Sequence, residues 1–410
     1  MNELRLGCIA DDYTGATDLS AMLVREGFRV IQCFGIPTAD ECDALLDADA
    51  IVIALKSRSI AANEAVEQSL AALRLLRSQG VTRFFFKYCS TFDSTRHGNI
   101  GPVADALADE LNQEIVFFCP AFPENGRTVY CGHLFVDGVP LHESGMRHHP
   151  LNPMNDSNLV RVLQWQSYRR VLSLPLSDEL PPSSPVHYVV DAINDEDLKR
   201  VAERAKSHTM MTGGSAIAGR WASEIGVRRS GAYPITSLPG QTNPPRVDRP
   251  GVILAGSCSD ATARQMTEFE SRYPVLRIEI EEGFDVPDMI ESTVDWCQQN
   301  WQHAGQPIAV SSGTKTAIRT NETATKIESF FAGLAVALRD EGVTQFIVAG
   351  GETSGAVVNA LAIRAVRIGP EISPGVPWVT SVGPNPMLLA LKSGNFGGDR
   401  FFLDALESRS

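Results

Sequence analysis

Short runs of residues that are apolar on both faces recur along the first half of the chain. They cover Leu6–Ala10, Ala50–Leu55, Phe84–Tyr88, Ile115–Ala121 and Val186–Ala192. A strand inside a parallel sheet is covered by helices on both sides, so its sequence is a continuous apolar run rather than an alternation of apolar and polar residues. Because the segments between the runs are long enough for helices, the pattern predicts a parallel α/β domain.

The segment after the first run shows the spacing of an amphipathic helix. Ala16, Leu19, Met22 and Leu23 recur at helical intervals, directly after the polar residues that follow Leu6–Ala10. We therefore expect the chain to begin with a strand, a tight turn and a helix.

The second half repeats this pattern with runs at Val252–Ser257, Val275–Ile280, Ile308–Gly313 and Phe346–Gly351. A further apolar stretch ends at Lys392, and we interpret it as a helix. The sequence therefore predicts a second α/β domain, each domain being a mainly parallel sheet flanked by helices, with a cleft between them.

A proline-rich segment separates the two halves. Residues 226–250 carry five prolines and little apolar periodicity, which is typical of an irregular connection between domains. We place the boundary near Pro245, so that residues 1–245 form the N-terminal domain with the linker 226–245, and residues 246–410 form the C-terminal domain. A length of 410 residues suits two separate cores.

Composition and charge narrow the classes of partner. Hydrophobic residues make up 43% and charged residues 21%, close to the values of ordinary globular proteins. The net charge is −13 and no run is rich in Lys or Arg, which argues against nucleic acid and anionic membranes as partners. The oligomeric state stays open, with a homo-oligomer included.

Three features indicate a cytoplasmic protein. The N-terminus lacks the pattern of a signal peptide, and no apolar stretch approaches the ~20 residues that span a bilayer. The eight cysteines form no C-x-x-C pair, so we expect reduced thiols rather than disulfides or a zinc site.

Acidic, cationic and hydroxyl side chains follow the predicted strands of the first half. In parallel sheets, ligands bind at the carboxyl ends of the strands, because loops and helix N-termini meet there. The residues in question are Asp11, Asp12, Arg58, Lys87, Ser90, Thr91, Asp93, Gly213, Gly214 and Ser215. Cations suit a carboxylate and aspartates suit hydroxyls, so the set fits an acid that also carries hydroxyls.

Some of these residues have a simpler explanation. Thr14, Ser57 and Asp93 taken singly are as typical of helix caps as of a binding site. The adjacent carboxylates of Asp11 and Asp12 favour function, because two like charges at a buried sheet edge repel each other.

The second half offers a phosphate loop. Glycines at 350, 351 and 355 follow a strand and precede an apolar helix, so backbone N–H groups could approach a phosphate at the helix N-terminus. The chain has no G-x-x-x-x-G-K-[ST] Walker A loop, and the turn lacks the G-x-G-x-x-G dinucleotide pattern. A later cluster at Gly394, Asn395 and Gly397 could cover a nucleotide, or could be the C-cap of the preceding helix.

Several unusual strings, in one order, resemble the four-carbon acid sugar kinase family. They are IADDYTGATDLS at Ile9–Ser20, KYCSTFDST at Lys87–Thr95, HGNIGPV at His97–Val103, CPAFPENGRTVYCGHLFVDGVPL at Cys119–Leu141, VAGGETSGAVVNAL at Val348–Leu361 and LALKSGNFGGDRFF at Leu389–Phe402. The stretch His142–Gln164 is most similar to the 3-oxo-tetronate members of that family.

The resemblance implies an acid-sugar-binding N-terminal domain and a nucleotide-binding C-terminal domain. It implies transfer of phosphate from ATP to the terminal hydroxyl of a four-carbon acid, giving the 4-phosphate. Matched by position, the resemblance implies that the acid is surrounded by Asp12, Arg58, Lys87, Ser90, Asp93, Gly213, Gly214 and Ser215. The nucleotide residues are Ser257, Gly350, Gly351, Glu352, Thr353, Ser354, Gly355, Gly394, Asn395 and Gly397.

The position of Asp12 at a strand end suggests that it is the general base, with Asp93 as the alternative. Mg²⁺ held mainly through the phosphates would leave no ligand motif, and the sequence does not identify its protein ligands.

Three other functions remain for comparison. The acceptor could be D-threonate or D-erythronate, or the protein could be a sugar-acid sensor with a regulatory nucleotide site. A sugar-acid dehydrogenase would need a dinucleotide fingerprint after the first strand, where the chain has ADDYTGATD instead.

Overall fold

The computed structural model describes residues 4–148, 152–177, 185–233, 251–257, 259–278, 285–304, 306–312, 321–394 and 396–407. The chain forms two compact units, Met1–Ala232 and Tyr233–Ser410. The boundary expected near Pro245 lies outside the described residues.

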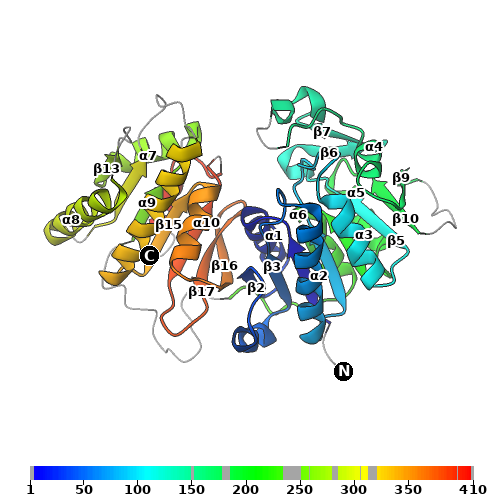
Figure 1. The fold of residues 1–410 in the computed structure, drawn as a ribbon, viewed down its shortest axis with the longest axis horizontal. Helices are drawn as coiled ribbons and strands as arrows, with labels where there is room; N and C mark the ends of the chain where they lie inside the picture. The colour runs from blue at the N-terminus through cyan, green and yellow to red at the C-terminus, as the bar shows by residue number, and fades with distance from the viewer. Residues whose placement is uncertain are drawn as a thin grey trace. The chain divides into compact units, whose positions relative to one another are not determined.

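In unit 1, a parallel sheet is interleaved with helices (Figure 1). Its strands run in the order β2-β3-β1-β4-β11-β5-β10-β9, and all neighbours are parallel. Their bounds are β1 Leu6–Ala10, β2 Val30–Phe34, β3 Ala50–Ala54, β4 Arg83–Lys87, β5 Ile115–Cys119, β9 Arg170–Leu174, β10 Val186–Val190 and β11 Met210–Gly213.

Helices cover this sheet in two layers. Helices α1 (Tyr13–Arg25), α6 (Ser215–Glu224) and α5 (Asp195–Arg204) pack side by side in one layer. Helices α2 (Ala62–Ser78), α3 (Ile100–Glu110) and α4 (Leu159–Gln164) pack in the other. With helices on both faces, strands β1, β2, β3 and β10 are buried at every position, which explains their continuous apolar sequences.

A small antiparallel sheet is inserted after β5, and the sequence did not reveal it. It consists of β6 (Arg127–Tyr130), β7 (His133–Val136) and β8 (Val139–Pro140). Four 3₁₀ segments complete the unit: η1 Ala39–Asp47, η2 Pro123–Asn125, η3 Leu141–Glu143 and η4 Gly145–His148.

In unit 2, the strands run in the order β13-β14-β12-β15-β18-β17-β16. The bounds are β12 Val252–Ala255, β13 Val275–Ile278, β14 Ile308–Ser312, β15 Gln345–Ala349, β16 Ala365–Ser373, β17 Val376–Ser381 and β18 Leu388–Lys392. The four neighbouring pairs β13–β14, β14–β12, β12–β15 and β15–β18 are parallel. The pairs β18–β17 and β17–β16 are antiparallel. Two α/β units with mainly parallel sheets confirm the predicted fold class.

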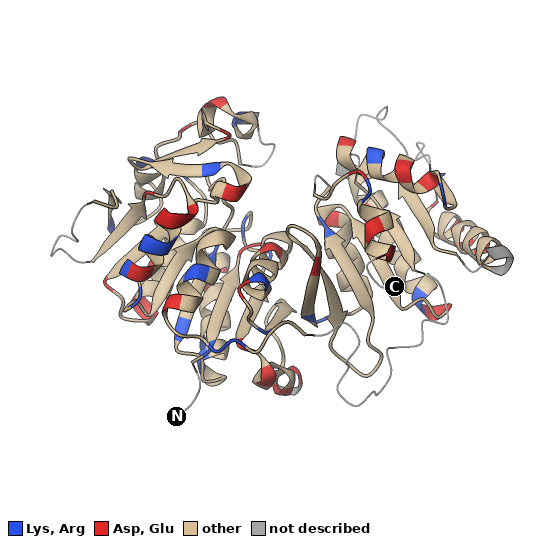
Figure 2. Ribbon diagram, turned by 180° about the vertical axis from the view of Figure 1, so that it is seen from behind, with Lys and Arg blue, Asp and Glu red and all other residues tan. Residues whose placement is uncertain are grey.

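The helices of unit 2 also form two layers. Helices α8 (Val286–Ala304), α9 (Asn321–Asp340) and α10 (Gly351–Ala360) pack in sequence, and α7 (Asp260–Glu270) packs on α11 (Phe401–Glu407). The core beneath α7 and α11 contains Phe269, Trp378, Phe401 and Phe402, all nearly fully buried. Most charged residues lie along the helices and turns, and fewer lie on the strands (Figure 2).

The expected helix before Lys392 is wrong. Leu388–Lys392 is strand β18, which pairs with β15 on one side and β17 on the other. A short apolar run has no periodicity that separates a strand from a buried helix, and tertiary pairing decided in favour of the strand. The Gly394 cluster is therefore a loop after a strand and not a helix C-cap.

Candidate functional site

The strands of unit 1 end at a common level. In the register of the sheet, Ala10 lies opposite Ala54 and Lys87, and Gly213 lies opposite Lys87 and Cys119. The loops that leave these strand ends therefore emerge side by side. This register brings the acidic, cationic and glycine segments predicted from the sequence to one edge of the sheet.

Arg58 and Asp11 form the centre of this cluster. Arg58 donates from Nε to Asp11 Oδ2 at 2.9 Å and from Nη2 to Asp11 Oδ1 at 2.8 Å, a two-pronged contact that the planar guanidinium favours. The Asp11 side chain is 7% exposed and the Arg58 side chain 21%. Burial raises the pKa of the Asp11 carboxyl more than the charge of Arg58 lowers it.

Asp12 is the more open carboxylate of the pair, with a side chain that is 24% exposed. It is the N-cap of α1: its Oδ1 accepts from the Gly15 N–H at 3.2 Å, and its Oδ2 accepts from the Thr14 hydroxyl at 2.6 Å. Arg58 Nη2 also donates to Asp12 Oδ1, at 2.6 Å. Burial acts to raise the pKa of Asp12, but Arg58, Lys87 and these hydrogen bonds outweigh it, so the pKa is lowered. Asp12 is therefore ionised at neutral pH.

Lys87 places a second cation at the same edge. It is the last residue of β4 and only 3% exposed, and its Nζ donates to the carbonyl of Tyr88 at 2.9 Å. Its charge contributes to the lowered pKa of Asp12. A Cβ added at Gly15 would lie 3.0 Å from Lys87 Nζ, so this ammonium group lies against the first turn of α1.

The loop after β4 brings a third carboxylate to the cluster. Asp93 Oδ1 accepts from the Thr91 hydroxyl at 2.7 Å, and its Oδ2 lies 3.7 Å from Arg58 Nη1. Between these residues, Phe92 has a φ of +60°, and its buried ring packs against Tyr88 with 5.4 Å between ring centroids. A bulky residue in this conformation is uncommon and must be held by its surroundings, so the loop has a defined shape.

Gly213, Gly214 and Ser215 lie beside this loop, where β11 passes into α6. A Cβ at Gly213 would lie 2.3 Å from the carbonyl of Cys119, and one at Gly214 would lie 3.5 Å from the Cβ of Ser90. The Ser215 hydroxyl, which is buried, donates to the carboxylate of Asp18 in α1. These residues are therefore close to Ser90, another member of the predicted acid site.

Asn99 supports the site, and no sequence pattern indicated its part. Its side-chain amide donates to the carbonyls of Ser57 and Ile60 at 2.7 and 2.9 Å, and so fixes the turn that carries Arg58. These contacts span some forty residues of chain, and no local pattern marks them. Asn99 lies within the string HGNIGPV, for which the family resemblance implied no role.

In unit 2, the glycine turn after β15 follows the expected geometry. Gly350 has a φ of +124°, which favours glycine, and α10 begins at the next residue. Gly351, Glu352, Thr353, Ser354 and Gly355 form the first turn of α10, in which Glu352 is exposed while Thr353, Ser354 and Gly355 are buried. The free N–H groups at the start of a helix suit an anionic ligand.

Two further loops come to the same level. Ala349 lies opposite Ala255 in β12 and opposite Lys392 in β18, so the segments starting at Gly256, Gly350 and Ser393 leave neighbouring strands together. A Cβ at Gly394 would lie 2.2 Å from the hydroxyl oxygen of Ser257, so the two predicted residues are in direct contact. Gly397 has a φ of +81° and packs against Phe401. Asn395 lies outside the described residues.

Side chains of α7 and of its N-cap, Ser259, hold the Gly394 loop, and no sequence pattern indicated Thr262 or Gln265. The carbonyl of Gly394 accepts from Ser259 Oγ at 2.7 Å and from Thr262 Oγ1 at 2.9 Å. Gln265 Nε2 lies within 3.0 Å of the carbonyls of Phe396, Gly397 and Gly398. Because helix and loop are about 130 residues apart in sequence, only the fold reveals these contacts.

The described residues contain neither a metal cluster nor a membrane span. Within these ranges, no group of three or more His, Cys, Asp or Glu side chains could hold a metal ion. Among the helices built from the same residues, none is long and apolar enough to cross a membrane.

Comparison with known proteins finds relatives over nearly the whole chain. A family model of a sugar-binding N-terminal domain matches residues 6–221, and one of a nucleotide-binding C-terminal domain matches residues 252–402. The 3-oxo-tetronate kinase of Cupriavidus necator is 45% identical over 426 residues, covering 98% of this chain and 96% of that protein. The 3-oxo-tetronate kinase of Brucella melitensis is 42% identical over 425 residues, covering 99% and 96%. The crystal structure of Haemophilus influenzae protein HI1011 has a TM-score of 0.80 at 38% identity, covering 98% of this chain and 99% of that one.

The fold, the two clusters and the two domain matches define the class as a two-domain carbohydrate kinase, with separate units for sugar and nucleotide. The chain belongs to the four-carbon acid sugar kinase family.

Proposed function

We propose that this protein is an ATP-dependent 3-oxo-tetronate 4-kinase, which transfers the γ-phosphoryl group of ATP to the terminal hydroxyl of the acid. The observation that carries the proposal is the likeness to proteins named 3-oxo-tetronate kinase, at 42% and 45% identity over nearly the whole chain. The strand-end cluster of unit 1 supports it, since cations and an ionised carboxylate are the groups that an acid with a reacting hydroxyl requires.

In this proposal the residues of unit 1 divide into three roles. Arg58 and Lys87 neutralise the carboxylate of the acid, and Asp11, already bound by two hydrogen bonds, fixes the Arg58 fork. Ser90, Thr91, Asp93, Gly213, Gly214 and Ser215 line the acid. Asp12 accepts the proton of the C4 hydroxyl, because it is ionised and the more exposed of the two candidates. Its side chain is 24% exposed, whereas that of Asp93 is 9% exposed.

In unit 2, backbone N–H groups at the start of α10 bind phosphate oxygens, and Ser257 and the Gly394 loop complete the nucleotide site. ATP is the donor. Mg²⁺ belongs to the proposal as an ion held mainly through the phosphates, where it would supply charge neutralisation. Glu352, exposed in the first turn of α10, is the carboxylate beside the glycine turn that such an ion could meet.

The function is tested by coupled ADP release with 3-oxo-tetronates, D-threonate and D-erythronate as acceptors. We expect turnover on a 3-oxo acid and much slower release with the saturated acids. Faster release with D-threonate or D-erythronate would assign the protein to that acceptor instead. Binding of both ligands without ADP release would indicate the sugar-acid sensor.

The role of Asp12 is tested by Asp12→Asn. Asparagine can still cap α1, so the fold and acid binding should persist, while turnover falls by about 10²–10⁴-fold with the loss of the proton acceptor. Asp93→Asn is the matched comparison. A larger loss of turnover in Asp93→Asn than in Asp12→Asn would move the proton acceptor to Asp93.

We also propose a cytoplasmic location. The described cysteines are free thiols, among them the buried Cys8, Cys33 and Cys119. Reduced thiols and a requirement for ATP both suit that compartment.

A further inference from the structure

Lys392 is a buried lysine at the centre of the nucleotide loops. It is the last residue of β18 and only 1% exposed. Its Nζ donates to Thr262 Oγ1 at 3.3 Å and to the carbonyls of Ser393 and Gly394 at 3.2 and 3.1 Å. The rings of Phe401 and Phe402 lie 5.7 and 5.8 Å from Nζ. The ammonium group is therefore enclosed by hydroxyl, carbonyl and aromatic groups.

Lys87 of unit 1 also ends a buried strand, but unlike Lys392 it has a carboxylate nearby among the described residues. Both lysines end a strand, both are buried, and both donate to the carbonyl of the next residue. The charge of Lys87 acts on the carboxylate of Asp12. Lys392 forms no ion pair with any described carboxylate.

The charged residues on the elements packed around Lys392 either form ion pairs with other residues or are exposed to solvent. On α7, Asp260 is exposed and Arg264 pairs with Asp399 at 2.8 Å. At α11, Asp404 lies 3.4 Å from Arg400, and Glu352 on α10 is exposed. Strands β15 and β17, on either side of β18, contain no charged residue.

A buried cation without a counter-charge is costly, and proteins normally pair it. Burial lowers the pKa of Lys392 to about 8, because it disfavours the charged form of the amine. Lys392 donates a hydrogen bond to the carbonyl of Gly394, and Gly394 packs directly against Ser257. An anion bound where the loops starting at Gly256, Gly350 and Ser393 meet would therefore supply the missing charge.

We propose that Lys392 is a positioning residue of the nucleotide site, a fixed cation that attracts the phosphate groups of ADP and ATP while it holds the Gly394 loop in place. The inference rests on the proposed function, because it concerns the same nucleotide site. The ligand class is a nucleoside polyphosphate, and the nucleoside alone should gain nothing from Lys392.

The first test compares ADP and adenosine binding by calorimetry in the wild type and in Lys392→Met, which keeps the length of the side chain and removes its charge. We expect ADP affinity to fall about tenfold or more, the effect of losing one charge-assisted interaction. Adenosine affinity should stay within about twofold. Lys199→Met, which removes an exposed lysine of unit 1, is the control and should change neither value.

The second test needs no variant. Near pH 8 about half of the Lys392 side chains are neutral in the free protein, and bound phosphate should raise the pKa again. The wild type should therefore take up as much as about half a proton per ADP, seen as a dependence of the binding enthalpy on the ionisation enthalpy of the buffer. Adenosine should cause no uptake.

The outcomes separate this inference from the proposed function. Wild-type protein that binds no ADP contradicts both. Tight ADP binding that Lys392→Met leaves unchanged, or an equal loss for ADP and adenosine, contradicts the role of Lys392 alone. Absence of proton uptake in the wild type also contradicts the role of Lys392. This second test does not depend on the folding of Lys392→Met.

Discussion

Arg58 holds Asp11 with two parallel hydrogen bonds, of 2.9 and 2.8 Å, and the same guanidinium reaches Asp12 at 2.6 Å. One side chain from the turn after β3 thus connects both carboxylates that follow β1. The turn itself is anchored to the same place, because the N–H groups of Ser57 and Arg58 donate to the Asp11 carbonyl at 3.0 and 3.2 Å. Asp11, which the sequence predicts to bind substrate, is therefore a support for Arg58 in the structure.

Replacing Arg58 should affect both stability and acid binding. Arg58→Ala leaves the buried Asp11 carboxylate without its cation, a change that typically costs about 3 kcal/mol or more. For a unit of this size, about 2–4 °C of melting temperature is lost per kcal/mol, and calorimetry measures the shift. The KM for the acid should rise in the same variant, while the KM for ATP stays unchanged.

Two other variants calibrate this result. Arg58→Lys keeps the charge but not the two-pronged geometry, so it should fall between the wild type and Arg58→Ala. Arg25→Ala removes an exposed ion pair with Glu124 and should cost less than about 1 kcal/mol. If Arg58→Ala melts no lower than Arg25→Ala, the Arg58–Asp11 contact does not stabilise unit 1.

Contact between Gly394 and Ser257 makes the Gly394 loop, which we propose binds the nucleotide, sensitive to one added methyl group. In Gly394→Ala, the added Cβ would lie 2.2 Å from Ser257 Oγ, so the Ser257 side chain or the loop must move. We expect the KM for ATP to rise about tenfold with little change in the KM for the acid. Gly398→Ala is the matched control, because a Cβ there meets no atom within 4 Å. Equal KM values for ATP in both variants would remove the Gly394 loop from the nucleotide site.

The parts that sequence predicted well share one physical basis. Parallel strands are buried on both faces and end at a common edge, so continuous apolar runs indicate both the strand and the place in unit 1 where Asp11, Arg58 and Lys87 must gather. Within unit 2, the same rule indicates the position of Gly350 at the end of β15. Strand β18 was misread because its five-residue apolar run carries no periodicity, and only its pairing with β15 and β17 identifies it.

Other features depend on contacts that no local pattern encodes. Gln265 reaches a loop about 130 residues further along the chain. Such contacts become visible only when the fold brings distant segments together.

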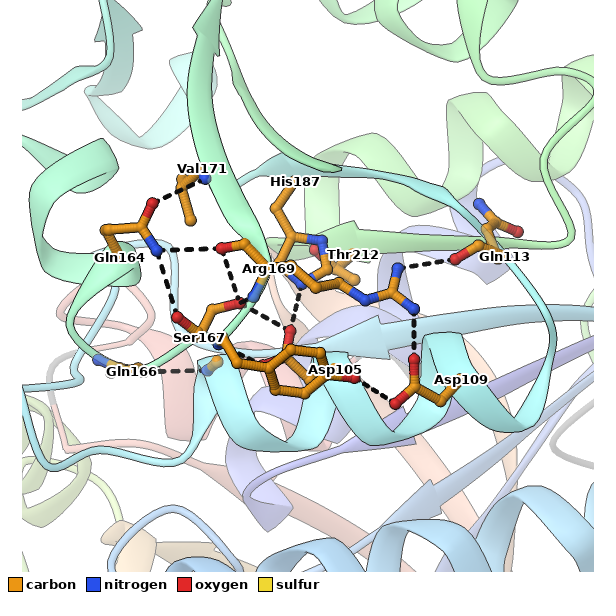
Figure 3. Close-up of polar contacts among 12 residues, drawn as sticks. Asp105, Asp109, Gln113, Gln164, Gln166, Ser167, Arg169, Val171, His187 and Thr212 are labelled. Atoms are coloured by element: carbon orange, nitrogen blue, oxygen red, sulfur yellow. Dashed lines mark hydrogen bonds and ion pairs between the residues drawn. The ribbon is translucent and has the colours of Figure 1, made fainter. Parts of the chain in front are cut away.

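Gln166 connects the loop after β4, which we propose lines the acid, to a buried polar network, and of the two KM values its removal should change only the one for the acid. Its Oε1 accepts from Ser94 Oγ at 3.3 Å and from the Gly101 N–H at 3.0 Å, and its Nε2 donates to the Thr95 carbonyl at 2.5 Å. The next residue, Ser167, donates to Asp105 at 2.7 Å, and His187 is also bound to Asp105 (Figure 3). We expect Gln166→Ala to raise the KM for the acid severalfold and to leave the KM for ATP unchanged.

Gln164→Ala supplies the comparison for this prediction. Gln164 binds the carbonyls of Ser167 and Arg169 and the N–H of Val171, so it holds the same segment (Figure 3). Its side chain forms no hydrogen bond with the described residues Ser94, Thr95 and Gly101. Both variants should lower the melting temperature, and only Gln166→Ala should change the kinetics. Parallel changes in the two KM values for the acid would show a general loosening of unit 1.

His208 should make unit 1 sensitive to acid. It packs against Phe117 with 4.7 Å between ring centroids, and burial lowers its pKa to about 4 from an ordinary value of 6.5. Between these two values the unfolded chain binds more protons than the folded one, so this contribution to stability is complete above pH 6.5 and is lost as the pH falls towards 4. The loss approaches about 1.4 kcal/mol per pH unit at most. In His208→Phe, which keeps an aromatic ring and removes the titration, calorimetry from pH 8 to pH 4.5 should show a smaller fall in melting temperature. Parallel curves for wild type and variant would mean that other groups cause the acid sensitivity.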